Sequence, residues 1–528
     1  MGWIDHVWLG ILAVFQGPEL FNIVGLSIPV TIVMILAGFL AGIAVGATPG
    51  LAGPIAMAIS LPILISIFGF NDDALLPVMG FLLGVMKGAT VGGAVPAILF
   101  NTPGTPDAYM TTLDGYPMTM RGESRKALRI AHFSSASGDT FSDIVLILCA
   151  PFLALLVERY LDLPEKTALL ILSLAVIASV IDGSPGKGLL SLGLGLLAAY
   201  VGTGEDFYPR LSMGTQVLAQ GIPIAAVVLG VLIVGEVFRS LEEILNESRD
   251  SGTIKTIEQR GDQKLHRSDI RKLIPYIARS AVIGTVVGAL PGIGSTLAAT
   301  MGYGSGRASH IRKGKKPPFG EGAPEGIAAT EAANSSVSGA NLIPVLSLGI
   351  PGNAAAVFLI LAADTIGGFN PGPSVFRLTA ETVNPELVIA FGIFAMMMIA
   401  NALNWTIGGI FMRSMGFMSR VPKHILLPIV LLLTLTSIYV QETRMAALWL
   451  TIGFGILGYL MRRLGISPLP LVIAFILGAK LEEAARQAFA STGGDAWFLF
   501  TSPIAATFMA IAVLVVVISL RKSNGSAQ

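Results

Sequence analysis

The chain has 528 residues, of which 53% are hydrophobic and only 13% are charged, and its mean hydropathy is +0.75. A chain of this size and hydropathy is too apolar for a soluble globular protein, so the composition predicts an integral membrane protein. The formal net charge is +1 and the basic residues are scattered, so no basic stripe is available for a nucleic-acid backbone. The single cysteine, Cys149, lies in an apolar run and is expected to be a small buried hydrophobe without a disulfide or metal role.

Residues 1–16 form the first expected element. They have no basic region and no small-residue cleavage site, which argues against a removable signal peptide. The stretch is too short to cross a bilayer, and Trp3 and Trp8 are of the residue type that is enriched at membrane interfaces. We therefore expect an N-terminal interfacial helix.

Two kinds of apolar segment follow along the chain. Nine runs are long enough, or nearly so, for ordinary spanning helices: 141–158, 167–182, 187–203, 221–238, 387–412, 424–440, 445–461, 467–479 and 501–520. The stretches 21–70, 74–120 and 273–366 are interrupted by Pro-Gly pairs and small residues, which predicts broken or re-entrant helices. The polar segment 239–272 near the midpoint is expected to be a surface linker.

An internal repeat relates the two halves of the chain. GATPG, which contains Pro49, resembles GALPG, which contains Pro291, at an offset of 242 residues (291 − 49). NTPG, which contains Pro103, resembles GIPG, which contains Pro351, at an offset of 248 residues (351 − 103). A longer loop between the two motifs of the second copy, at 307–326, accounts for the difference. Two motifs in the same order indicate a duplication.

Basic residues predict how the two copies lie in the membrane. No Lys or Arg precedes Lys87, whereas Arg239–Lys272 and Arg307–Lys316 bracket the second copy. By the positive-inside rule, the first motif is entered from outside and the second from the cytoplasm. Continuing this alternation places 25 basic residues inside and 7 outside, which supports two inverted copies.

The expected fold class is an all-α integral membrane protein of two inverted-topology repeats, with broken or re-entrant helices and roughly 10–12 membrane segments. The expected parts are the N-terminal interfacial helix at 1–16, a first membrane repeat at 17–240, a cytoplasmic linker at 241–272, a second membrane repeat at 273–485, and a C-terminal spanning helix and tail at 486–528.

The helix breaks are the predicted binding site. A break at bilayer depth leaves backbone groups without partners, at a cost of several kcal/mol each. The freed helix N-termini favour an anion, and unwound carbonyl groups can bind a cation. Small residues also occur where helices merely pack closely, but packing does not require a break in both copies. The candidate substrate- and ion-binding residues are Thr48, Pro49, Gly50, Asn101, Thr102, Pro103, Gly104, Thr105, Pro291, Gly292, Ser295, Asn334, Ser335, Ser336, Pro351, Gly352 and Asn353.

Ionisable residues in apolar surroundings are further candidates, because their desolvation is costly. Lys87 is expected to counter an anionic substrate, to extend to the interface, or to pair with a carboxylate. Glu331 is expected to bind a cation or carry a proton, or else to be an N-terminal helix residue near the interface. Four other carboxylates are weaker candidates, expected as caps or pairs near helix ends: Asp107, Asp139, Asp143 and Asp364.

Six motifs occur in order along the chain: ATPGLAGPIA, GGAVPAILFNTPGTPDA, LDGYP, ALPGIGS, EGIAATEAANSS and LIPVLSLGIPG. Together they resemble the large membrane subunit of tripartite tricarboxylate transporters, over nearly the whole chain. The resemblance implies a cation-driven importer in the bacterial inner membrane. It also implies two partners, a small membrane subunit and a periplasmic solute-binding protein that delivers organic acids.

The family motifs match defined positions in this chain. ATPG and NTPG match Ala47–Gly50 and Asn101–Gly104, PGIGS and GIPG match Pro291–Ser295 and Gly349–Gly352, and EAAN matches Glu331–Asn334. Some members have a hydroxyl-rich run before NTPG, where this chain has Ala-Val-Pro. The cargo is therefore a citrate-like substrate or a different carboxylate.

These observations predict the translocation subunit of a secondary transporter that imports tricarboxylates or dicarboxylates by alternating access. Na⁺ is favoured over H⁺ as the coupling ion, since the breaks are rich in neutral oxygen ligands, and no cofactor is expected. The alternative is a channel or uncoupled pore for small organic anions, because re-entrant loops also build selectivity filters. Catalysis is not expected, since Ser295 has no convincing histidine partner, and no Walker A pattern occurs.

Overall fold

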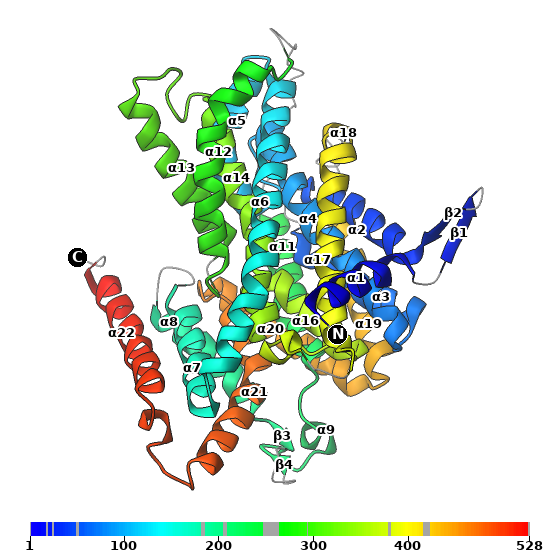
Figure 1. The fold of residues 1–528 in the computed structure, drawn as a ribbon, viewed down its shortest axis with the longest axis vertical. Helices are drawn as coiled ribbons and strands as arrows, with labels where there is room; N and C mark the ends of the chain where they lie inside the picture. Colours follow the sequence, from blue (N-terminus) through cyan, green and yellow to red (C-terminus); the bar gives the residue numbers. More distant parts are fainter. Residues whose placement is uncertain are drawn as a thin grey trace. The chain divides into compact units, whose positions relative to one another are not determined.

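The computed structural model describes residues 2–16, 19–23, 26–48, 52–180, 185–203, 209–246, 263–292, 294–378, 382–414 and 423–525. Within these residues the chain is mainly helical (Figure 1). Two short antiparallel hairpins, β1 (Glu19–Ile23) with β2 (Leu26–Pro29) and β3 (Gly202–Thr203) with β4 (Pro209–Arg210), are the exceptions in the described part. The predicted all-α class is therefore confirmed.

The chain divides into two compact units. Unit 1 comprises Met1–Phe152, Arg249–Leu290 and Gly294–Pro422, and unit 2 comprises Leu153–Ser248, Pro291–Ile293 and Lys423–Gln528. Each unit thus draws on both halves of the sequence. The five-part division expected from the sequence stays a prediction, and residues 247–262 of the expected linker lie outside the described part.

Pro291-Gly292 belongs to unit 2, whereas the described motifs Pro103-Gly104 and Pro351-Gly352 lie in unit 1. Its elements are α1 (Trp3–Phe15), α2 (Val30–Gly46), α3 (Gly53–Phe68), α4 (Asp72–Phe100), η1 (Pro106–Ala108), α5 (Tyr109–Met120), most of α6 (Ser124–Tyr160), α12 (Arg267–Gly288), α13 (Ser295–Arg312), α14 (Pro324–Ala340), α15 (Leu342–Leu348), α16 (Ala354–Ile366), η3 (Pro373–Phe376), α17 (Pro385–Leu403), η4 (Asn404–Gly408) and α18 (Gly409–Ser414). The β1–β2 hairpin also belongs to this unit.

Unit 2 is a second helical bundle. Its elements are α7 (Leu163–Val180), α8 (Pro185–Ala199), α9 (Gln216–Ala219), α10 (Ile224–Val228), η2 (Leu229–Val234), α11 (Gly235–Asn246), α19 (Lys423–Glu442), α20 (Met445–Arg463), α21 (Leu469–Ser491), η6 (Phe498–Phe500) and α22 (Pro503–Gly525), together with β3 and β4. Within it, α7 packs against α8, α21 and α22.

Six helical stretches in the described part are long and apolar enough to cross a membrane: 73–100, 124–160, 224–242, 385–414, 445–463 and 503–521. Every run predicted as an ordinary span is mainly helical over its described residues, although the run 187–203 leaves the helix at Ala199 and ends in β3. The chain is therefore a multi-pass membrane protein.

Glycines determine how closely the first helices of unit 1 approach. Gly38 and Gly42 of α2, and Gly84 and Gly88 of α4, recur every four residues. A Cβ atom added at Gly42 would lie 2.5 Å from the Val85 carbonyl oxygen, and at the other three it would also overlap the facing backbone. Small residues at this spacing let membrane helices pack backbone against backbone.

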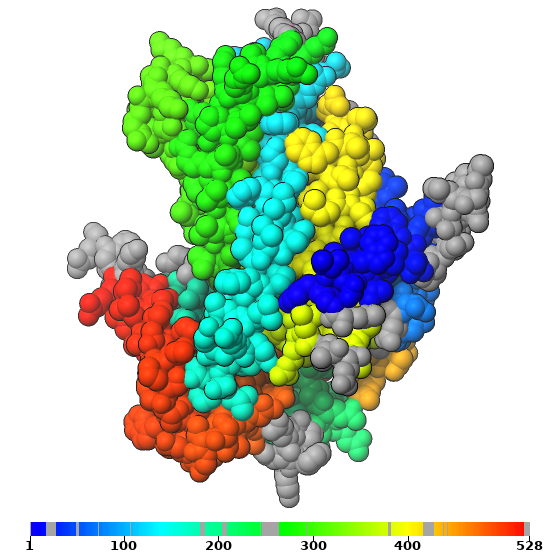
Figure 2. All heavy atoms as spheres, viewed as in Figure 1, coloured from blue at the N-terminus to red at the C-terminus, as the bar shows by residue number. Residues whose placement is uncertain are grey.

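The N-terminal helix agrees with the sequence in its bounds. Helix α1 lies on the surface of α17 in the space-filling view (Figure 2). The Trp3 ring meets the edge of Phe391 with centroids 6.0 Å apart, and a Cβ at Gly10 would meet the same α17 side chain. The placement of α1 at a membrane interface stays a prediction.

Three local expectations are wrong. The broken stretch expected from residue 21 begins with the β1–β2 hairpin, and its helix starts only at Val30. The helix expected over 141–158 already starts at Ser124. Its first half is polar, so hydropathy alone does not identify it. Cys149 is exposed on the surface of this helix rather than buried. Its neighbours Leu148 and Phe152 are exposed too, as expected of a face that contacts lipid.

Candidate functional site

The NTPG and GIPG breaks have the same backbone geometry. Helix α4 ends at Asn101 with φ 55° and ψ 24°, and α15 ends at Gly349 with φ 70° and ψ 22°. After each of them, the next N–H bonds back to a proline carbonyl, Pro96 O at 3.3 Å and Pro344 O at 3.2 Å. Such left-handed caps are typical of Gly and tolerated by Asn. The two caps are 248 residues apart (349 − 101), which matches the offset between the motifs.

The ATPG and ALPG breaks also correspond. Helix α2 ends at Ala47 with φ −73° and ψ −8°, and α12 ends at Ala289 with φ −71° and ψ −12°. The next helices follow extended caps, Ala52 with φ −90° and ψ 158° and Gly294 with φ −76° and ψ 163°. Both pairs are 242 residues apart (289 − 47 and 294 − 52). Both stretches therefore run through helix, break, helix, helix, break, helix, whereas their origin by duplication and their inverted orientation stay predictions.

Each copy places its second break beside the other copy. Within the first copy, Gly104 of NTPG lies against the Gly46 carbonyl at the end of α2, where a Cβ would overlap it. Just beyond, the Asp107 carboxylate in η1 accepts a hydrogen bond from the Thr296 hydroxyl at 3.0 Å, in the first turn of α13. Helix α16, which follows GIPG, packs against α3 and α4 of the first copy. The two copies thus interlock within unit 1.

The LDGYP motif fixes the approach to α14. Asp114 Oδ1 accepts backbone N–H groups from Gly320 at 2.9 Å, Gly322 at 2.9 Å and Ala323 at 2.7 Å, all in the loop that leads into α14. Arg121, further along the chain, donates to the Gly322 carbonyl at 2.7 Å. No structural role for this motif is apparent from the sequence alone. In the structure it holds the loop before the candidate site.

Helix α14 carries a polar stripe through the buried interior of unit 1. Glu331, Asn334, Ser338 and Asn341 follow at spacings of three, four and three residues, which places them on one helix face. All four are buried. Glu331 lies in the middle of the helix and is 0% exposed, so the interpretation of Glu331 as an N-terminal interface residue is wrong.

Several polar atoms beside the breaks have no hydrogen-bond partner among the described residues. Thr111 donates to Glu331 Oε1, but Oε2 of the same carboxylate accepts nothing. The amide groups of Asn334 and Asn341 and the hydroxyl of Thr105 are likewise unpartnered. A buried group left unsatisfied costs about 1–3 kcal/mol. Glu331 and Asn334 are about one helical turn apart, whereas Asn341 lies about 15 Å of helix beyond Glu331, so these groups mark a polar path along α14 with Glu331 and Asn334 as its closest pair.

Other predicted site residues are satisfied within the protein. Ser335 shares a hydrogen bond with a serine of α6. Ser336 donates to a backbone carbonyl of α6 at 2.9 Å. Thr48, just after the end of α2, donates to a carbonyl of that helix at 3.0 Å, and Asn353 accepts an N–H of the first turn of α16 at 2.8 Å. These four contacts support helix packing and capping, and none needs a ligand.

The remaining predicted residues are distributed as follows. Asn101 and Thr102 are exposed, Pro103 and Ser295 are half-buried, and Gly104, Pro351 and Gly352 are buried, all in unit 1. Pro291 and Gly292 group with unit 2, where Gly292 has φ +82° and packs on Ile177. Pro49 and Gly50 lie outside the described residues.

A second polar cluster lies between α4, α6, α14 and α17. Lys87 Nζ is 2.7 Å from Asp139 Oδ1 and forms a second ion pair with Asp143. Asn401 donates to Asp143 Oδ2 at 2.7 Å, and Ser338 donates to Asp139 Oδ1 at 2.5 Å. Of the alternatives for Lys87, pairing with a carboxylate is the one that the structure shows.

The expectation that Asp139 and Asp143 lie near helix ends is wrong. They lie in the interior of α6, four residues apart, which puts both on one face of the helix. Two aspartates at this spacing, together with one lysine in an apolar segment, are the features of the sequence that indicate a buried ion pair. The hydropathy pattern predicts a helix only from residue 141, which leaves Asp139 in a loop and Asp143 at a helix end.

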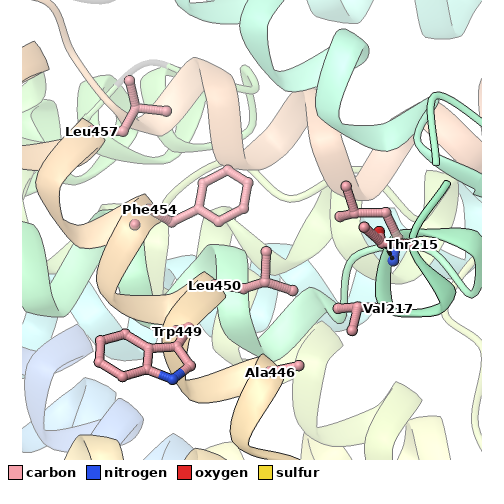
Figure 3. Close-up of a pocket in the computed structure, with 9 residues that line it drawn as sticks. Thr215, Val217, Ala446, Trp449, Leu450, Phe454 and Leu457 are labelled. Carbon is pink, nitrogen blue, oxygen red and sulfur yellow. Dashed lines mark hydrogen bonds between the residues drawn. The ribbon is translucent and has the colours of Figure 1, made fainter. Parts of the chain in front are cut away.

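A groove of about 630 Å³ lies in unit 2 between α9 and α20 (Figure 3). Trp449, Leu450, Phe454 and Leu457 line it on one side and Thr215 and Val217 on the other. Its lining has no charged side chain, so it lacks the chemistry to hold a carboxylate.

Comparison with known proteins identifies the family. The chain is 33% identical over 505 residues, 94% of each chain, to the "uncharacterized 52.8 kDa protein in TAR-I ttuC′ 3′region" of Agrobacterium vitis. It is 34% identical over 245 residues to the "uncharacterized protein in TAR-II ttuC′ 3′region" of the same organism, covering 46% of this chain and 95% of that one. No solved structure matches the chain. The model of the tripartite tricarboxylate transporter TctA family matches residues 32–473, so the chain belongs to this family and is a subunit of a tricarboxylate transporter.

Proposed function

We propose that this chain is the translocation subunit of a cation-coupled secondary transporter in the bacterial inner membrane. It imports tricarboxylates or dicarboxylates by alternating access. A periplasmic solute-binding protein delivers the cargo, and a small membrane subunit completes the complex. Family membership supports the transporter class. The observation that carries the proposal further is the set of unpartnered buried groups beside the breaks, on Thr105, Glu331, Asn334 and Asn341.

The chemistry of these groups favours a small hard cation. A carboxylate oxygen, amide oxygens and a hydroxyl are all oxygen donors, as Na⁺ requires, and sodium sites in transporters use such groups beside unwound helix segments. Among the described residues no cluster of three or more His, Cys, Asp or Glu could hold a metal ion. At Glu331 and Asn334, one helical turn apart, a single carboxylate beside neutral oxygens suits a weakly held monovalent ion better than a divalent ion.

The start of α13 is the expected place for a cargo carboxylate. A helix N-terminus attracts anions, because its first N–H groups lack partners and its dipole end is positive. In this structure Asp107 accepts from Thr296 there, so a carboxylate of the protein already lies at this helix start. A carboxylate of the cargo is chemically similar. Exchange of one carboxylate for the other would couple cargo binding to movement of the NTPG segment.

Accumulation against a gradient separates this proposal from a channel. The full chain, reconstituted in liposomes with its small subunit and solute-binding protein, is given radiolabelled citrate as the probe. With an inward Na⁺ gradient we expect citrate inside to exceed the outside concentration, and collapse of the gradient with a sodium ionophore should release it. Uptake that stops at equal concentrations, whatever the Na⁺ gradient, would support the uncoupled pore instead.

A further inference from the structure

We infer that Lys87, Asp139 and Asp143 form a proton-binding site, separate from the unpartnered groups at the breaks, in which Asp143 takes up one proton. The inference rests on the proposed function, because it adds H⁺ as a second coupled ion. The reaction is reversible formation of an O–H bond between a proton from water and the Asp143 carboxylate, which becomes a neutral carboxylic acid.

The geometry places three ionisable groups in one buried contact. Lys87 Nζ pairs with Asp139 and Asp143, and it lies 3.4 Å from the Asn401 Oδ1 atom. The side chains of Lys87 and Asp143 are 0% exposed and that of Asp139 is 3% exposed. Water therefore has almost no access to these charges in this conformation.

The charges of this cluster do not balance. One ammonium and two carboxylates give a net charge of −1, and a buried charge without a counter-charge is strongly disfavoured. Helix α14 contributes Ser338 and α17 contributes Asn401, which are neutral. Helix α2, packed along α4, has no ionisable residue, and the only one in α17 is Glu386 in its first turn.

Other ionisable groups on the neighbouring helices are engaged elsewhere. On α6, His132 Nε2 bonds with the Asn404 carbonyl at 2.9 Å, two helical turns before Asp139. On α14, Glu331 bonds with Thr111 of α5, two turns before Ser338. Within the described residues, no further charge thus contacts the cluster. Uptake of one proton is the simplest way to bring its charge to zero.

The hydrogen bonds identify Asp143 as the proton acceptor. Asp139 Oδ1 accepts from both Lys87 and Ser338. Asp143 Oδ2 accepts from Lys87 and Asn401, but its Oδ1 is buried and accepts nothing. This oxygen faces the α14 backbone at Gly339, where a Cβ would overlap it. A sodium ion fits less well, because the Lys87 ammonium already lies between the two carboxylates.

The test is an infrared titration of the full chain in lipid, without cargo. Protein labelled with ¹³C at the aspartate side-chain carboxyl separates aspartic acid C=O bands from those of glutamic acid. We expect such a band to grow as the pH falls and to be lost in Asp143→Asn, which leaves one balanced ion pair. The control Asp364→Asn removes an exposed carboxylate of α16 and should leave the band unchanged.

A second variant keeps the test decisive if Asp143→Asn folds poorly. In Asp139→Asn the cluster is neutral with Asp143 ionised, so the band should appear only at lower pH than in the wild type. A wild-type protein without the band, or a band unaltered in both variants, overturns the inference.

Transport assays separate this inference from the proposed function. Asp143→Asn should lose the pH dependence of citrate uptake and keep its Na⁺ dependence. Failure of Na⁺-driven uptake in the wild type would count against the proposed function and leave the infrared band in place. Absence of the band would contradict the proton site and leave the sodium-coupling proposal unaffected.

Discussion

Lys87→Met is expected to destabilise the protein more than Asp139→Asn or Asp143→Asn. Without Lys87 two carboxylates remain together in the buried contact, whereas each Asp→Asn change leaves one complete ion pair. Removing one partner from a buried ion pair costs about 3–5 kcal/mol, because the other charge is left uncompensated. Thermal unfolding in detergent, followed by fluorescence of the 5 tryptophans, measures the loss.

Two further variants control this result. The double variant Lys87→Met/Asp143→Asn removes one of the repelling charges and should recover part of the loss. Lys166→Met disrupts a half-buried pair with Glu158, with N and O 3.2 Å apart, and should cost about 0–1 kcal/mol. If Lys87→Met unfolds at no lower temperature than Lys166→Met, the buried ion pairs do not stabilise the protein in the way that the structure indicates.

Asn334→Ala is expected to abolish uptake while the protein still inserts and folds. The Asn334 amide has no partner among the described residues, so its removal breaks no internal hydrogen bond. Loss of one hydrogen bond to a charged ligand, worth about 1.5–3 kcal/mol, corresponds to a roughly 10- to 150-fold fall in apparent affinity, which abolishes uptake at citrate and Na⁺ concentrations near the wild-type KM. Citrate uptake over a range of citrate and Na⁺ concentrations measures this fall, and the elution profile in detergent checks folding.

Matched asparagine variants sharpen this prediction. Asn71 is exposed before α4 and its side chain makes no capping bond, so Asn71→Ala should transport normally. Asn101→Ala should also abolish uptake, whereas Asn101→Gly keeps the left-handed cap of α4 and tests the side chain alone. Wild-type uptake by both Asn334→Ala and Asn101→Ala would mean that the breaks do not form the binding site.

The sequence predicted the breaks because Pro and Gly mark them directly. Asn101 and Gly349 have matching left-handed caps, at the offset that the NTPG and GIPG motifs gave. Backbone geometry of this kind is local, and it follows from residue type and spacing. The membrane-spanning helices were predictable for a similar reason, since length and hydropathy define them.

The sequence could not predict which distant side chains meet. Lys87 and Asp143 are 56 residues apart in the chain and lie on different helices. The first half of α6 and most of α14 are too polar for a hydropathy search, although both lie inside unit 1. Their polar residues are satisfied by one another across the helix interfaces, as the Ser135–Ser335 bond illustrates. A polar residue such as Glu331 is therefore assigned to a membrane interface from the sequence, although the structure buries it.

The unpartnered groups are the structural support for the proposed site. Thr105 and Asn334 are buried without partners, although most polar groups in a folded protein are paired. The sequence indicated both as site residues from their place beside the breaks. It could not distinguish them from Ser335 and Ser336, which the protein satisfies itself.

Thiol accessibility at the NTPG break tests the central claim most directly, because the chain has a single cysteine. In a Cys149→Ser background, Thr102→Cys places an exposed thiol at the break, and Thr501→Cys places a matched exposed thiol in unit 2. We predict that citrate and Na⁺ together slow maleimide labelling at Thr102→Cys and leave Thr501→Cys unaffected. Labelling at Thr102→Cys that is equally fast with and without citrate and Na⁺ would contradict a cargo site at these breaks.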